Sequence, residues 1–145
     1  MKITLLFLFV FLFSLSGFSQ SLEGEWNGSY TYNSPYDIRH PNPTRIRLKF
    51  ILNKDSSYTV FSNSDDLDFS YVYSVAYKRI SPDSIYLQEQ RIIEPANTKV
   101  SNLQEMHLKI EHRKKSSVLA GEWVSRTWIN YRGEISFAKK QDKKN

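Results

Sequence analysis

Cysteine is absent from the 145-residue chain, and its absence excludes several classes of protein. Without thiols the chain forms no disulfide scaffold, zinc ribbon or iron–sulfur site, and it has no thiol nucleophile and no cysteine for a lipid anchor. The motifs G-x-S-x-G, G-x-G-x-x-G, H-E-x-x-H and the P-loop are absent as well. We therefore expect a protein that is not an enzyme, with no catalytic residue, no cofactor and no metal.

Long hydrophobic runs are confined to the beginning of the chain. After Lys2, residues 3–13 form an eleven-residue run that is apolar except for Thr4, too short to span a bilayer core of about 30 Å comfortably. Gly17 and Ser19 then place small residues where a signal peptidase acts. The pattern predicts a signal peptide over residues 1–19, with cleavage after Gln20 or retention as an anchor as the alternatives. We expect an exported protein, periplasmic or extracellular, with no stable membrane insertion after cleavage.

The remaining 126 residues (145 − 19) are enough for one domain with a real core. Hydrophobic residues make up 40% and charged residues 24% of the chain, a composition typical of a folded domain and not of a disordered one. We predict a single domain over residues 20–139, monomeric, followed by a charged disordered tail over residues 140–145.

The excess of positive charge is local. The formal net charge is +5, but four lysines lie within residues 139–144 and three basic residues occupy the turn at 113–115. The rest of the chain is close to neutral and has no basic stripe on one face. We therefore expect no nucleic-acid partner.

Apolar residues alternate with polar ones along most of the chain, and a helical period of 3.6 is hard to find. Polar turns separate the alternating segments, and this arrangement predicts an all-β antiparallel up-and-down barrel of about eight strands, lipocalin-like and without a packed helix. The predicted strands are residues 22–32, 44–52, 58–61, 69–77, 84–93, 103–111, 118–129 and 134–139, of which 118–129 is the longest.

A short sequence, L-x-G-E-W, occurs twice, at residues 22–26 and 119–123. The repetition indicates a common strand environment. In it, the glycine lets a large indole lie close to the backbone, and the tryptophan plugs one end of a core.

The G-x-W at residues 24–26 opens the first predicted strand, the L-x-G-x-W at 119–123 follows late in the chain, and the last strand, within residues 133–140, ends in lysines. In these features the chain resembles small secreted lipocalin-like (calycin-type) β-barrel proteins of bacteria. The resemblance implies a helix-free relative of the lipocalins, because no candidate for their packed helix is present. It also implies that Trp26 closes the barrel floor and contacts no ligand.

Tyrosines are concentrated on strand faces. Phe69, Tyr71, Tyr73 and Tyr77 share one face, and Tyr30 and Tyr32 share another. Such a row is typical of a barrel core, of a mostly apolar pocket with a few polar groups, or of an aromatic platform on the outer surface. The residues predicted to bind a ligand are Tyr30, Phe50, Tyr58, Tyr71 and Tyr73.

Three other groups of residues are weak candidates for a metal site or for catalysis. His107 and His112 lie five apart, so in one strand they face opposite sides and do not share a metal. The carboxylates within 65–68 lack the other ligands of a calcium loop. Glu23 and Glu25, roughly 6–7 Å apart on a strand, have a spacing suited to acid–base hydrolysis, but a solvated polar face is the expected environment.

Two functions remain open at this stage. In the first, the barrel binds a small apolar or amphipathic ligand, with no cofactor. In the second, a solid barrel is a structural or protein-partner-binding module, of the inhibitor or immunity type, and acts through the loops at 33–43 and 64–68. A cavity above about 300 Å³ favours the first and a filled core the second.

Overall fold

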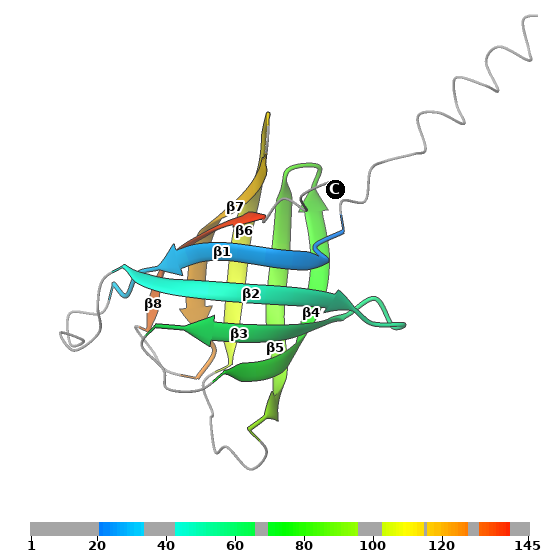
Figure 1. Cartoon of the computed structure of the whole chain (residues 1–145), viewed down its shortest axis with the longest axis vertical. Coiled ribbons are helices and arrows are strands. Elements are labelled where there is room, and N and C mark those ends of the chain that lie inside the picture. Colours follow the sequence, from blue (N-terminus) through cyan, green and yellow to red (C-terminus); the bar gives the residue numbers. More distant parts are fainter. Residues whose placement is uncertain are drawn as a thin grey trace, which may run out of the picture.

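The fold is a closed antiparallel barrel of eight strands, seen in a computed structural model that describes residues 21–33, 43–65, 70–95, 103–114, 116–127 and 131–139 (Figure 1). Each strand pairs with the next in sequence, and β1 pairs with β8 to close the sheet. The described residues contain no helix. The predicted fold class is therefore confirmed. The strands are β1 (Gly24–Tyr30), β2 (Thr44–Leu52), β3 (Tyr58–Ser64), β4 (Tyr71–Ser81), β5 (Ser84–Glu94), β6 (Gln104–Arg113), β7 (Ser116–Ser125) and β8 (Arg132–Lys139).

Some strand bounds differ from those predicted. β4 and β5, with 11 residues each, are the longest strands, whereas β7 ends at Ser125, so the prediction of a longest strand over 118–129 is wrong. β3 extends to Ser64, where polar residues had indicated a loop, because Asn63 and Ser64 still pair with β2. Small hydroxyl side chains on its inner face, at Ser62 and Ser64, line a cavity described below.

The β4–β5 pair contains bulges that change which side chains face inward. Ser74 pairs with Arg91 and the next residue, Val75, pairs with Glu89, so one extra residue of β5 lies between them. An extra residue reverses the alternation of a strand beyond it. As a result, Leu87 and Glu89 face the interior on one side of the bulge and Ile92 faces it on the other.

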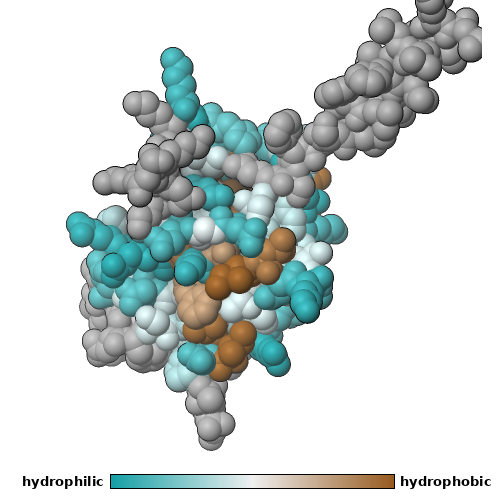
Figure 2. Space-filling view, turned by 45° about the vertical axis from the view of Figure 1, so that its right-hand side comes forward, coloured by the Kyte–Doolittle hydropathy of each residue, from teal (hydrophilic) through white to brown (hydrophobic). Residues whose placement is uncertain are grey.

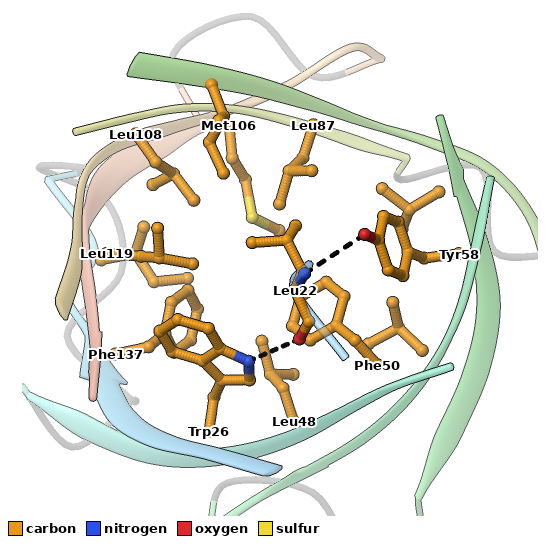
Figure 3. Close-up of a cluster of buried hydrophobic side chains, with 14 of the residues drawn as sticks. Leu22, Trp26, Leu48, Phe50, Tyr58, Leu87, Met106, Leu108, Leu119 and Phe137 are labelled. Carbon is orange, nitrogen blue, oxygen red and sulfur yellow. Dashed lines mark hydrogen bonds between the residues drawn. The ribbon is translucent and has the colours of Figure 1, made fainter. Parts of the chain in front are cut away.

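The core is one cluster of apolar side chains that fills the barrel around Trp26 (Figure 3). Its members come from the described parts of all eight strands and from Leu22, which precedes β1. The largest fully buried side chains are Trp26, Trp123, Phe137 and Leu22. Every strand therefore contributes to a single interior, as expected when a sheet closes on itself.

The glycines of the two L-x-G-E-W segments do not act as predicted. Gly24 has a φ of +111°, a conformation that glycine favours. At Gly121 a Cβ atom would lie 1.9 Å from the backbone oxygen of His107, so this glycine accommodates a neighbouring strand and not an indole. The glycine that lies against an indole is Gly133, where a Cβ would come within 2.6 Å of Trp123 Nε1.

The outer surface is largely hydrophilic but carries an apolar patch (Figure 2). The large hydrophobic residues exposed in the described ranges are Ile51, Leu52, Phe61, Ile80 and Ile93.

No helix in the described ranges is long and apolar enough to cross a membrane. The predicted signal peptide at 1–19 and tail at 140–145 lie outside the described residues, as do Phe69 and most of the two predicted loops at 33–43 and 64–68.

Candidate ligand-binding cavity

One end of the barrel is sealed by its own N-terminal segment. Leu22 lies across the interior, where its N–H donates a hydrogen bond to the Tyr58 hydroxyl at 3.2 Å and its carbonyl accepts one from Trp26 Nε1 at 2.8 Å (Figure 3). Lys139 Nζ lies 5.7 Å from the centre of the Trp26 ring. Trp26 is only 1% exposed, so it closes this end as the resemblance to lipocalin-like barrels implied.

The other half of the barrel contains a cavity of about 200 Å³. Residues of all eight strands and Tyr32, which follows β1, line it. The lining residues are Tyr30, Tyr32, Ile46, Leu48, Ser62, Ser64, Tyr71, Tyr73, Glu89, Ile92, Gln104, Met106, Trp123, Ile135 and Phe137. The lining thus combines apolar side chains with hydroxyls, one amide and one carboxyl, a composition typical of small-molecule sites.

A cluster of four aromatic rings lies at one wall of this cavity. Tyr30, Tyr32 and Trp123 line the cavity, and Tyr131 packs beside them. Tyr32 makes edge-to-face contacts with Tyr30 and Trp123, both at 5.3 Å between ring centres, and with Tyr131 at 5.6 Å. The indole Nε1–H of Trp123 donates to the Thr31 carbonyl at 3.1 Å. Edge-to-face packing and this hydrogen bond hold the rings in fixed positions.

Glu89, a half-buried residue whose carboxyl lies among the inward side chains of β5, is the acidic residue of the lining. The backbone N–H of Gln104 donates to its Oε2 at 2.8 Å, but burial outweighs this hydrogen bond and raises the pKa of Glu89 from 4.5 to about 8. Arg126 is nearby, yet its Nη1 donates to the backbone carbonyl of Glu89 at 3.2 Å and its Nε faces the Glu105 carboxylate at 3.4 Å. No lysine, arginine or histidine is among the described residues that line the cavity.

Tyr73 links the acidic residue to the hydroxyl side of the cavity. It is 7% exposed, and burial raises the pKa of its phenol well above the usual value, with the charge of Glu89 adding to the effect and a hydrogen bond with Ser62 opposing it. A phenol with a raised pKa stays protonated across physiological pH. Tyr73 is therefore a neutral hydrogen-bonding group in the cavity.

The five residues predicted to bind a ligand fall into two groups. Tyr30, Tyr71 and Tyr73 line the cavity. Phe50 and Tyr58 do not: they are packed in the core, 5.8 Å apart between ring centres, and Tyr58 contacts Leu22 at the sealed end. All five side chains point inward, and alternation along a strand does not distinguish the two ends of a barrel.

Glu89 and Trp123 are the cavity residues of most chemical interest that sequence reasoning missed. Glu89 follows Ile85 and Leu87 at a spacing of two, which was a usable signal that a carboxyl faces the core. Trp123 was recognised only as a structural plug. The bulge that turns Ile92 inward has no clear mark in the sequence.

No protein-family model matches the chain, and no curated protein matches it. Among solved structures, the chain is similar to EF1p2_mFAP2b, which was determined bound to DFHBI, with a TM-score of 0.51 and 10% identity over 83% of this chain and 94% of that one. A de novo designed fluorescence-activating β-barrel gives a TM-score of 0.47 and 9% identity over 85% and 96%. The likeness to EF1p2_mFAP2b shows a shared fold. The chain is an eight-stranded barrel of lipocalin-like fold.

Proposed function

We propose that this protein is an exported, non-enzymatic barrel that binds one small apolar or amphipathic molecule in the cavity beside Trp123. The observation that carries the proposal is the cavity itself, about 200 Å³ of space inside an otherwise close-packed barrel. The aromatic side chains that line the cavity suit the apolar part of a ligand, and the hydroxyl-bearing residues suit a few polar atoms of the ligand. The similar barrel EF1p2_mFAP2b, bound to DFHBI, supports the fold's suitability for such a role.

The size of the cavity limits the ligand. At about 200 Å³ it falls short of the roughly 300 Å³ that marks a drug-sized site and that was expected of a ligand-binding barrel, although the interior is not filled either. A cavity of about 150 Å³ accommodates benzene. The proposed ligand is therefore a compact molecule built on one ring or a short chain.

The alternative, a solid barrel that acts on a protein partner, has less support. The interior is filled around Trp26 but contains a cavity beside Trp123. A barrel that acted only through its loops would not require that cavity. The loops assigned to partner binding lie mostly outside the described residues, so their geometry adds nothing to that hypothesis.

Export is proposed from the apolar run at residues 3–13 and the small residues that follow it. We expect the chain isolated from the host envelope to begin at Gln20, or at Ser21 with the alternative cleavage. Intact-mass measurement of that chain checks both the compartment and the cleavage site, and a full-length mass in the cytoplasmic fraction would contradict the proposal.

Ligand binding is tested by native mass spectrometry of the protein purified from its host envelope. We expect a small-molecule adduct that is lost on denaturation. Ser62→Phe, which places a ring in the cavity, should abolish the adduct, whereas the neighbouring exterior variant Phe61→Ser should keep it. A bare polypeptide mass from the wild-type protein would contradict this function and favour the partner-binding module.

A further inference from the structure

We propose that the cavity is selective for a primary amine carried on a single aromatic ring, with the ammonium group on Glu89 and the ring beside Trp123. The inference rests on the proposed ligand-binding function and names the chemical class of the ligand.

The charged groups of the lining favour a cationic ligand over an anionic one. The cavity is lined by one carboxyl, that of Glu89, and by no basic residue among those described. Arg126, whose Nη1 donates to the backbone carbonyl of Glu89, directs its Nε to Glu105 at 3.4 Å. Glu89 Oε2 accepts a hydrogen bond from the Gln104 backbone, which holds the carboxyl in place without neutralising it. A carboxyl in such a place keeps its proton or, when a cation is placed against it, ionises to pair with that cation.

The rest of the lining also suits an ammonium group. Six residues that carry hydroxyl groups line the same space: Tyr30, Tyr32, Tyr71, Tyr73, Ser62 and Ser64. Hydroxyl oxygens accept hydrogen bonds from an ammonium group, and the faces of tyrosine and tryptophan rings attract cations. An anionic ligand would find no charged donor there, so these walls disfavour it.

The volume of the cavity sets the size of the ligand. With about 200 Å³ available, and benzene fitting in about 150 Å³, one ring and a short aminoalkyl chain fill the cavity. We therefore choose 2-phenylethylamine as the probe and 2-phenylethanol as its neutral counterpart, because the two differ mainly in the group that would meet Glu89.

The raised pKa of Glu89, about 8, gives the proposal a distinctive signature. At pH 7 the free protein holds a proton on Glu89, and an incoming ammonium group stabilises the ionised carboxylate, so the proton leaves on binding. The other titratable residues that line the cavity are Tyr30, Tyr32, Tyr71 and Tyr73, and Arg126, which donates to the Glu89 carbonyl, pairs with Glu105 outside the lining. Arg126 and Glu105 already form an ion pair, and Tyr73 stays protonated at this pH. One proton released per amine bound thus points to Glu89.

The experiment is isothermal titration calorimetry on the mature protein in buffers of different ionisation enthalpy. We expect 2-phenylethylamine to bind at least about tenfold more tightly than 2-phenylethanol at pH 8.5. We also expect release of close to one proton per amine at pH 7, and affinity rising up to about tenfold per pH unit below pH 8. Glu89→Gln should remove the preference and the proton release, whereas Glu134→Gln, an exposed carboxyl on β8, should leave both unchanged.

The other outcomes overturn the inference in distinguishable ways. Equal binding of amine and alcohol without proton release would refute amine selectivity and leave the ligand-binding function standing. Tighter binding of the alcohol, weakening above pH 8, would assign Glu89 the role of a neutral hydrogen-bond donor. Binding of neither probe would refute the amine class, and the adduct measurement under Proposed function would then decide, independently, whether the barrel binds any ligand. The pH dependence of the wild-type protein tests the inference even where Glu89→Gln fails to fold.

Discussion

The two ends of the barrel are built around the same five-residue pattern and have different interiors. Trp26 and Trp123 each close an L-x-G-E-W segment and are each 1% exposed. The indole of Trp26 donates to Leu22, which fills the space beside it. The indole of Trp123 donates to Thr31 at the barrel wall, and a cavity remains beside its ring. The comparison teaches that a tryptophan seals a barrel only where the chain supplies a second element to pack against it.

The largest expected effect comes from truncating the two tryptophans. Trp26→Ala should lower the free energy of unfolding by about 3–5 kcal/mol, because it opens a void in a filled core and leaves the Leu22 carbonyl without its donor. Trp123→Ala also loses one indole hydrogen bond, but it enlarges a space that already exists, so we expect a loss about 1–2 kcal/mol smaller. Urea denaturation of both variants measures the difference, and equal losses would show that the two ends are packed alike.

Glu89 should make the free energy of unfolding depend on pH. Its pKa is about 8 in the folded protein and ordinarily 4.5, so between these values the unfolded chain releases a proton that the folded protein keeps. The free energy of unfolding should therefore fall as pH rises from about 4.5 to about 8, by at most about 1.4 kcal/mol per pH unit, and level off above.

This pH dependence is checked by urea denaturation at several pH values. Glu89→Gln cannot ionise, so its profile should be flatter over the same interval and the variant should be the more stable protein at pH 9. Parallel profiles for the variant and the wild type would mean that the Glu89 carboxyl is not buried.

The smallest effect is expected at the sealed end, from the Tyr58 hydroxyl. Tyr58→Phe removes the acceptor for the Leu22 N–H, and we expect a loss of about 1 kcal/mol. Tyr77→Phe is the matched control: its ring lies 5.9 Å from that of Tyr58, and its hydroxyl makes no hydrogen bond to any described residue, so its stability should change by only a few tenths of a kcal/mol. Thermal denaturation is sufficient, and a loss in Tyr58→Phe no larger than that in Tyr77→Phe would mean that the hydroxyl of Tyr58 does not fix the Leu22 segment.

The fold was predictable from the sequence because alternation is a local property of each strand. Val60, Leu108 and Phe137 are buried as their strand periods require, and closure into a barrel follows from eight such strands joined by short turns. The ends of β3 and β7 were less predictable, because the pairing that extends Ser62–Ser64 depends on β2 and not on the residues themselves.

The candidate site was predictable only in part. Tyr30, Tyr71 and Tyr73 were identified as inward-facing aromatics and do line the cavity. Phe50 and Tyr58 have the same local pattern, but Leu22 fills the space beside Tyr58, and that contact joins residues 36 positions apart in the sequence. Which inward side chains face a hollow depends on such long-range packing, and this is also why Glu89 was overlooked.

The most direct test of the central claim, that a ligand enters beside Trp123 while the Trp26 end is sealed, is an NMR titration of the indole N–H signals with 2-phenylethylamine. The chain has three tryptophans, and single Trp→Phe variants assign the signals of Trp26 and Trp123. We predict that the Trp123 signal shifts progressively to saturation and that the Trp26 signal does not move. A shift of the Trp26 signal, or an unmoved Trp123 signal at saturating amine, would contradict the account.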